Sequence, residues 1–266
     1  MTRRIVVHPG FHKTGTSTAQ RLLWRNRELI WPVAALVLAD RMAPALAAAK
    51  DYSSWGDRRT LEAFGAHART LLSALDLGER RGAILSAENL GGHPPGRGGV
   101  RSYGDAAPDL MAELRRAVLR TWPDAHLVFV VGTRGRNAWL ASAWWQQLKQ
   151  GRMVLDEAEF AAAYSEGARL RRALRAIGKA VAPTPVREAR LEEVGGWRLG
   201  PAGPLLDALA IGGDRRARFE ALPPQNARPT GYRAIAARLL EINRTIEDPG
   251  EARRARKALL AASGAG

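Results

Sequence analysis

A short segment near the start of the chain, IVVHPGFHKTGTST (residues 5–18), combines residue types that bind anions in proteins. A β-branched run stops at a Pro-Gly, and a lysine, a glycine and several hydroxyl residues follow. Backbone N–H groups at the start of a helix point outward, and the helix dipole favours negative charge there. Gly15 lets the backbone approach a ligand closely, Lys13 adds a mobile cation, and further donors come from Thr16, Ser17 and Thr18. The segment predicts an anion-binding loop between a strand and a helix, with a capped helix and a solvated lysine as the alternative.

The order of residues in this loop argues against ATP bound with magnesium. The phosphate loop of nucleoside-triphosphate enzymes reads G-x-x-x-x-G-K-[ST], with the lysine directly after the second glycine. Here Lys13 comes two residues before Gly15. A central apolar strand of such enzymes is also expected to end in an aspartate for Mg²⁺, whereas LVFVV (residues 127–131) runs into Gly132-Thr133-Arg134. The pattern predicts an anion that is bound without a metal.

Alternating strand and helix segments must position this loop. Strands are predicted at residues 5–8, 83–86, 127–131 and 186–187, and helices at residues 18–27 and 137–149. A further amphipathic helix is marked by Ile235, Leu239, Ile242 and Ile246. Such alternation predicts an α/β fold with a central parallel sheet flanked by helices in three layers. The Gly/Pro-rich residues 91–99 and 223–229 are expected to be surface loops of one domain covering residues 1–266, and the tail from about residue 247 to be helical or partly disordered.

Composition limits the remaining possibilities. The formal net charge is +15, and only five of the 41 basic residues are lysines, so the charge reflects either general arginine usage or attraction of polyanions. With no cysteine, disulfides and thiolate metal sites are excluded. The longest apolar run, residues 29–39, is too short to cross a bilayer and contains Pro32. No signal peptide is recognisable, and a cytoplasmic protein is expected.

Two separated motifs resemble those of sulfotransferases that use 3′-phosphoadenosine 5′-phosphosulfate (PAPS). HKTGTST is similar to the loop with which this family holds the 5′-phosphosulfate, and VVGTRGRNAWLASAWWQQ supplies Arg134 and, eight residues later, Ser142, the spacing of the family's 3′-phosphate pair. ILSAENL resembles a Ser-x-Glu segment of bacterial members and contains Glu88. The resemblance is to bacterial, carbohydrate-type sulfotransferases, and it implies a P-loop-like fold.

The resemblance also implies roles for these residues. Lys13 would stabilise the oxygen that links the sulfuryl group to the leaving phosphate, and Arg134 with Ser142 would hold the 3′-phosphate. The 5′-phosphate would be held by Thr14, Gly15, Thr16 and Ser17. PAPS would be the co-substrate with no metal required, and the acceptor would be a hydroxyl or amine of a glycan, a glycolipid or a small molecule. Arg228 is a weaker candidate for closing over the nucleotide.

An acceptor hydroxyl must lose its proton, so a base is expected near the reacting atoms. Glu88 is the first candidate, with a structural ion pair as its alternative role. His12, next to Lys13, is the second candidate, and a role in orienting the loop is its alternative. His93 could approach the acceptor from its Gly/Pro-rich loop, whereas structural roles are expected for His8, His67 and His126, and core packing for most of Trp139, Trp144 and Trp145.

Two other functions remain compatible with the sequence. The first is a nucleotide or sugar kinase with an unusual phosphate loop, which would need Mg²⁺ and ATP. The second is a non-catalytic binder of polyanions, whose affinity would fall steeply with salt. No helix-turn-helix, zinc finger or aromatic RNA-reading motif is visible, so no nucleic-acid partner is predicted. The acceptor and the oligomeric state are not predicted.

Overall fold

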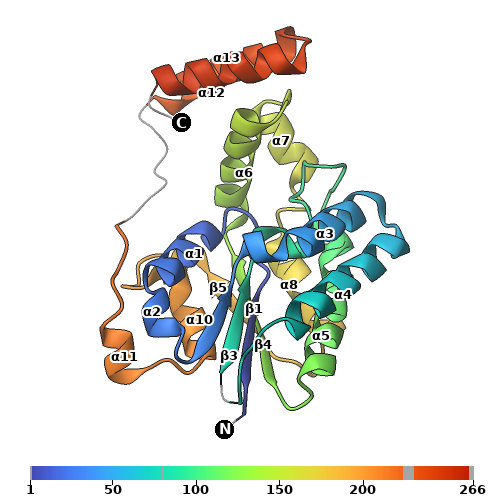
Figure 1. Cartoon of the computed structure of the whole chain (residues 1–266). Coiled ribbons are helices and arrows are strands. Elements are labelled where there is room, and N and C mark those ends of the chain that lie inside the picture. The colour runs from blue at the N-terminus through green and yellow to red at the C-terminus, as the bar shows by residue number, and fades with distance from the viewer. Residues whose placement is uncertain (1, 80, 224–230, 264–266) are drawn as a thin grey trace.

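A five-stranded, entirely parallel sheet forms the centre of the computed structural model, which describes residues 2–79, 81–223 and 231–263 (Figure 1). The strand order is β2-β3-β1-β4-β5. The strands are β1 (Arg4–His8), β2 (Ala34–Val37), β3 (Gly82–Ser86), β4 (His126–Thr133) and β5 (Val186–Arg190). The predicted α/β class with a central parallel sheet between helical layers is confirmed, and each of the four predicted strands overlaps an observed one.

The alternation of side chains along β1 produces two cores, one on each face of the sheet. Ile5 and Val7 belong to one cluster of buried apolar residues, while Val6 belongs to the cluster on the opposite face. Parallel pairing places Val6 beside Ile84 of β3 and Val128 of β4, so the second cluster continues across the sheet. Both faces of the central strands are covered, which is why LVFVV is apolar throughout.

Helices cover the two faces separately. The cluster of Ile5 and Val7 is covered by α3 (Ala43–Trp55), α4 (Arg58–Ser73), α5 (Ala107–Thr121) and α8 (Leu170–Ala180). The face of Val6 is covered by α1 (Thr16–Arg25), α2 (Arg27–Ile30), α9 (Leu191–Val194) and α10 (Gly203–Ala208). Farther along the chain lies α11 (Gly213–Ala217), and short 3₁₀ turns are η1 (Ala39–Met42), η2 (Glu88–Gly91), η3 (Tyr103–Asp105) and η4 (Gly200–Ala202).

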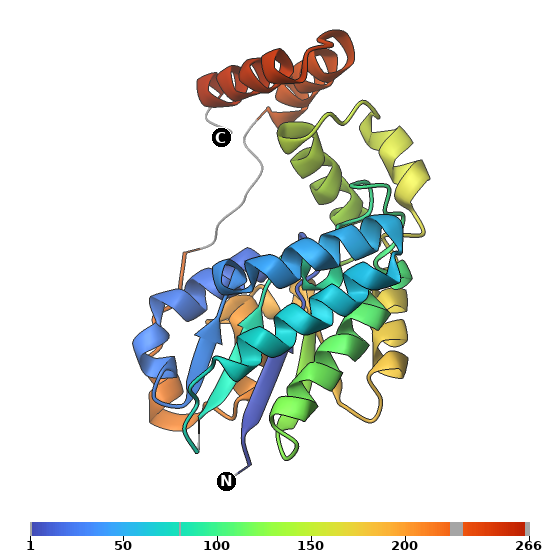
Figure 2. The same ribbon diagram turned by 45° about the vertical axis from the view of Figure 1, so that its right-hand side comes forward.

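Four helices stand beyond the carboxyl edge of the sheet, at the top of Figures 1 and 2. They are α6 (Arg136–Gln150), α7 (Glu157–Tyr164) and a helical pair, α12 (Tyr232–Thr245) and α13 (Pro249–Ala262). Fully buried Asn243 joins the pair to the end of α6, because its Nδ2 donates to the carbonyls of Leu148 (3.3 Å) and Met153 (2.9 Å). Its Oδ1 accepts from Arg256 Nη1 of α13 (2.8 Å). The tail beyond residue 247 is thus helical over most of its described length.

Some sequence predictions need correction. The helix predicted over residues 18–27 spans Thr16–Arg25 and ends where Asn26 Nδ2 donates to the carbonyl of Leu22 (2.9 Å). Strand β2 was not predicted, because it lies inside an apolar run without alternation. Residues 224–230, including Arg228, lie outside the described part of the chain. Within the described ranges, no helix combines the length and apolar character that crossing a bilayer would require.

Candidate functional site

The loop between β1 and α1 lies at the carboxyl edge of the sheet, and we call residues 9–15 the anion loop. The consecutive carbonyls of Phe11, His12 and Lys13 each accept a hydrogen bond from a side chain. Phe11 O accepts from Thr14 Oγ1 at 2.6 Å and from Thr16 Oγ1 at 3.4 Å. His12 O accepts from Trp139 Nε1 at 2.8 Å. With its carbonyls held in this way, the loop has a fixed backbone shape.

The hydroxyls of Thr14 and Thr16 turn inward. Both residues are buried, at 2% and 1% exposure, and both hydroxyls contact Phe11 O. The hydroxyls of these threonines therefore stabilise the loop, and only their backbone N–H groups remain to bind an anion. Ser17 differs, because its side chain is exposed and its hydroxyl donates to Glu88.

The backbone of the anion loop shares a feature with anion-binding concavities. Lys13 has φ 66° and Gly15 has φ 94°, so left-handed residues alternate with an ordinary one. Such alternation turns successive N–H groups toward one point. A left-handed lysine costs of order 1 kcal/mol, and such strain concentrates at functional sites. Gly15 is also the N-cap of α1 and has no side chain with which to satisfy the first N–H groups of that helix.

The anion loop lies directly against the end of β4. A Cβ on Gly132 would come within 2.5 Å of Thr14 Oγ1, so this position needs glycine for the close approach. Two residues farther along, Arg134 Nη1 donates to the carbonyl of Lys13 at 3.2 Å. The two separated motifs of the sequence, around Lys13 and around Arg134, therefore meet in space.

Ser142 and Arg134 belong to the same β4–α6 unit. Ser142 is half-buried on α6, the helix that begins directly after Arg134. The N-cap of this helix, Gly135, donates its N–H to Glu192 Oε1 at 2.8 Å. Burial acts to raise the pKa of Glu192, but the Gly135 hydrogen bond and the charges of Arg134 and Arg190 outweigh it and lower the pKa. Glu192 therefore places a negative charge near Arg134, and this residue was not identified from the sequence as part of the site.

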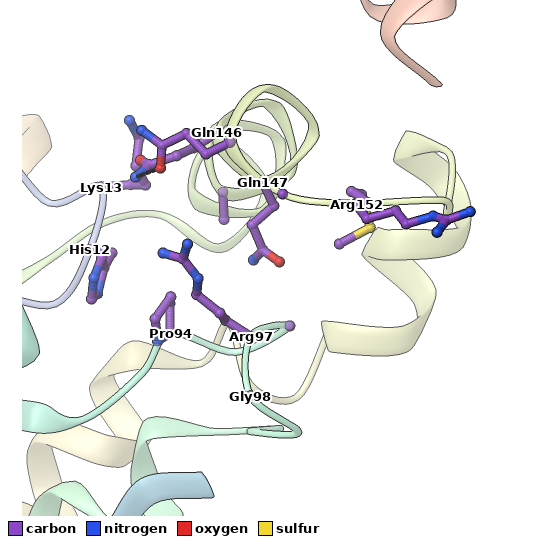
Figure 3. A pocket seen from close by; sticks show the side chains of 13 residues that line it. His12, Lys13, Pro94, Arg97, Gly98, Gln146, Gln147 and Arg152 are labelled. Atoms are coloured by element: carbon purple, nitrogen blue, oxygen red, sulfur yellow. Dashed lines mark hydrogen bonds between the residues drawn. The ribbon is translucent and has the colours of Figure 1, made fainter. Parts of the chain in front are cut away.

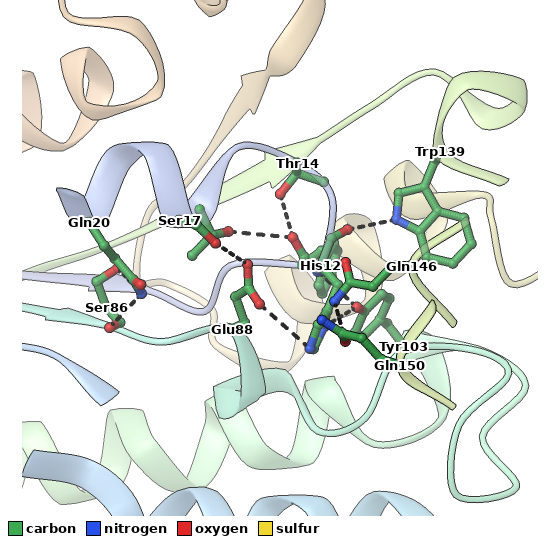
Figure 4. A network of polar contacts seen from close by, with 12 residues as sticks. His12, Thr14, Ser17, Gln20, Ser86, Glu88, Tyr103, Trp139, Gln146 and Gln150 are labelled. Atoms are coloured by element: carbon green, nitrogen blue, oxygen red, sulfur yellow. Dashed lines mark hydrogen bonds and ion pairs between the residues drawn. The ribbon is translucent and has the colours of Figure 1, made fainter. Parts of the chain in front are cut away.

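Glu88 and His12 lie close together beside the anion loop (Figure 4). Glu88 Oε1 accepts from Ser17 Oγ at 3.1 Å, and Oε2 lies 3.8 Å from His12 Nε2. Both candidates for the base therefore occupy one site with Lys13. Glu88 is half-buried, and this burial raises its pKa although the Ser17 hydrogen bond and the Lys13 charge act to lower it.

Tyr103 determines which nitrogen of His12 carries the proton. Its hydroxyl accepts from the His12 backbone N–H at 2.9 Å and lies 2.8 Å from Nδ1. No other partner of this hydroxyl occurs among the described residues, so its proton points to Nδ1 and the ring proton is on Nε2. Burial, followed by the charges of Arg97, His93 and Lys13, lowers the pKa of His12 to about 3. At neutral pH His12 is thus an uncharged donor facing Glu88, which favours Glu88 as the base.

A cavity of about 270 Å³ opens beside Lys13 and His12 (Figure 3). It lies between the anion loop, the turn of residues 94–98 and the second half of α6. Little in the sequence indicates this cavity, because its walls come from a loop without periodicity and from one face of a helix. The Gly/Pro-rich stretch was the only hint that these residues approach the site.

Within the described ranges, the remaining histidines make no hydrogen bond with His12, although His93 is close enough to affect its pKa. His8 is buried with Nδ1 2.8 Å from Ser86 Oγ, which agrees with the structural role predicted for it. His67 and His126 are exposed, so a role in packing is not supported for either. His93 is half-buried and packs beside Gly98.

Comparisons of the chain with protein-family models, with curated proteins and with solved structures give no match.

Proposed function

We propose that this protein is a PAPS-dependent sulfotransferase with a P-loop-like fold, acting on a hydroxyl or amine of an acceptor. The observation that carries the proposal is the hydrogen bond between Arg134 Nη1 and the carbonyl of Lys13. It brings a guanidinium, which suits a phosphate, next to a loop built to bind a second anion. A nucleotide with phosphates at both its 3′ and 5′ positions fits two adjacent anion sites of this kind.

In this proposal the anion loop holds the 5′-phosphosulfate. The N–H groups of residues 14–17 and the ammonium of Lys13 surround its oxygens, and Arg134 with Ser142 holds the 3′-phosphate. Glu192 would have to yield part of its position beside Arg134 to the incoming phosphate, because two anions at one guanidinium repel each other. The start of α6 then supplies a favourable dipole for the phosphate as it does for Glu192 now.

The placement of Lys13 and Glu88 supports sulfuryl transfer. The acceptor oxygen attacks sulfur, the bond from sulfur to the bridging oxygen breaks, and adenosine 3′,5′-bisphosphate leaves. Lys13 stabilises the charge that develops on the bridging oxygen, and one such donor contributes roughly 100- to 1000-fold in rate. Glu88 takes the acceptor proton, and its raised pKa makes it a stronger base than an ordinary glutamate. A glycan is the proposed acceptor.

Calorimetry with adenosine 3′,5′-bisphosphate tests the donor assignment. Wild type should bind this nucleotide equally in EDTA and in Mg²⁺, and Lys13→Met and Arg134→Gln should each weaken binding by about tenfold or more. Lys179→Met, which removes an exposed lysine of α8, should bind as wild type does. No binding by wild type would refute the proposal.

The same experiment separates the two other functions. Binding of ATP only with Mg²⁺ would support a kinase instead. Binding of polyanions that is insensitive to Lys13→Met and weakens steeply with salt would indicate a non-catalytic binder.

A further inference from the structure

The cavity beside Lys13 is shaped by a turn that is held firmly in place. Gln147 Nε2 of α6 donates to the carbonyl of Pro95 at 2.8 Å. Within the turn, Arg97 N donates to Pro94 O at 3.1 Å and Gly96 N to Val100 O at 2.9 Å. A Cβ on Gly96 would lie 2.8 Å from Gln147 Oε1, so glycine permits this contact. The turn thus presents Arg97 at a defined position.

Arg97 directs its guanidinium into the cavity, toward Lys13 and between His12 and Gln147 (Figure 3). Among the residues that the structure describes, no hydrogen bond or ion pair engages this guanidinium. Arg152 also lines the cavity, but its side chain extends away from it (Figure 3), and its Nη1 donates to the carbonyl of Glu247 at 2.9 Å. Arg97 is therefore the arginine that can meet a ligand here.

The rest of the described lining carries no carboxylate and combines glutamine amides with glycines and the apolar residues Pro94, Ala143 and Met153. Gln146 and Gln150 contribute amides, and Gln146 Nε2 donates to Gln150 Oε1 at 3.1 Å. Amide groups of this kind are suited to hydroxyls, which both donate and accept. The positive charge of Arg97 is felt nearby, since it contributes to lowering the pKa of both His12 and His93. The cavity volume is close to the lower end of small-molecule sites, roughly 300 Å³, which suits one ring rather than a long chain.

We propose that the acceptor bears an anionic group, a carboxylate or a phosphate on a sugar ring, which pairs with Arg97 while the glutamine amides bind its hydroxyls. This inference rests on the proposed function, because it assigns the cavity to the acceptor. Pairing at Arg97 would fix the ring beside Lys13 and Glu88, so that one hydroxyl faces the sulfuryl group. A neutral sugar would leave the guanidinium without this partner and would bind more weakly.

The test titrates three probes into the full chain saturated with adenosine 3′,5′-bisphosphate and into the chain alone, followed by NMR. The probes are methyl β-D-glucuronide, glucose 6-phosphate and neutral methyl β-D-glucoside, so the two anionic arms separate carboxylate from phosphate. We expect at least one anionic probe to bind wild type roughly 10- to 100-fold more tightly than the neutral probe. Arg97→Gln should abolish this preference, whereas Arg101→Gln, which removes an exposed arginine bonded to the carbonyl of Ala163, should preserve it.

The outcomes distinguish the two proposals. Equal binding of neutral and anionic probes by wild type, no binding of either anionic probe, or a preference that survives Arg97→Gln would each overturn the acceptor inference. Adenosine 3′,5′-bisphosphate should bind Arg97→Gln within about twofold of wild type, because the assigned phosphate contacts do not include this residue. Failure of wild type to bind the bisphosphate would refute the sulfotransferase itself, while the titrations of the chain alone would still decide whether Arg97 selects an anion.

Discussion

Tyr103→Phe removes one oxygen atom on which the position of His12 depends. The hydroxyl contacts both the backbone N (2.9 Å) and Nδ1 (2.8 Å) of His12. Tyr103 is 1% exposed and His12 is 7% exposed, so bulk water has little access to replace these contacts. Leaving a buried polar group without a partner costs about 1–3 kcal/mol, and the substitution leaves two such groups. We expect the free energy of unfolding to fall by about 2–4 kcal/mol.

Urea unfolding of wild type, Tyr103→Phe and Tyr164→Phe measures this effect. Tyr164 is a matched control, since it packs on Phe160 with ring centroids 4.7 Å apart and no hydrogen bond of its hydroxyl occurs within the described ranges. Its substitution should change stability by less than about 0.5 kcal/mol. Nitrogen-15 NMR should show the proton of His12 on Nε2 in wild type. If Tyr103→Phe is as stable as Tyr164→Phe, the hydroxyl does not hold His12 and the assigned tautomer loses its basis.

Three further outcomes are expected. Glu88→Gln should lower kcat by roughly 100- to 10,000-fold and remove the acidic limb of the pH–rate profile, a limb that in wild type should lie above the usual glutamate pKa; an unchanged profile would exclude Glu88 as the base. In the same urea unfolding experiments, Gly132→Ala should destabilise the protein by about 1–3 kcal/mol. Gly178→Ala in α8, with open space around its Cβ, should stabilise it by up to ~1 kcal/mol. Burial lowers the pKa of His8 to about 4 and that of His12 to about 3, so the unfolded chain binds protons more readily than the folded one below pH 6.5. The free energy of unfolding should therefore fall as the pH is lowered from 6.5 toward these folded values, by about 1.4 kcal/mol per pH unit for each histidine. His8→Asn should remove the contribution of one proton to this slope.

The strands were predictable where burial makes the sequence distinctive. LVFVV lies in β4, which is covered on both faces, and its continuous apolar run is typical of a buried parallel strand. Strand β2 was missed because Ala34–Val37 lies within a longer apolar run that contains Pro32 and has no turn signal at its edges. Strand β5 was predicted only in part, because its edge position admits charged residues. Glu188 of β5 accepts from Thr133 at 2.6 Å and pairs with Arg171 at 3.0 Å.

The residues of the site were easier to predict the closer they lie in the sequence to the end of a strand. Lys13, Glu88 and Arg134 each follow an apolar strand by a few residues, so a parallel sheet must gather them at one edge. Tyr103 and Arg97 follow β3 through a long connection, and nothing in their spacing indicates where that connection returns. The inward turn of the Thr14 hydroxyl was equally hidden, since it depends on the carbonyl of Phe11 rather than on sequence spacing.

The position of the site follows from the order in which the strands are joined. Strand β1 lies between β3 and β4, and its chain continues into α1 on one face, whereas the chains from β3 and β4 continue into α5 and α6, which pack with the opposite face. Loops that leave neighbouring strands in opposite directions open a crevice at their carboxyl ends, and ligands of α/β proteins bind there. The anion loop, Glu88 after β3 and Arg134 after β4 all lie at this edge of the sheet. In the proposed function, a ligand at this edge would contact connections from three strands, which suits a molecule with anions at separate points better than a single small ion.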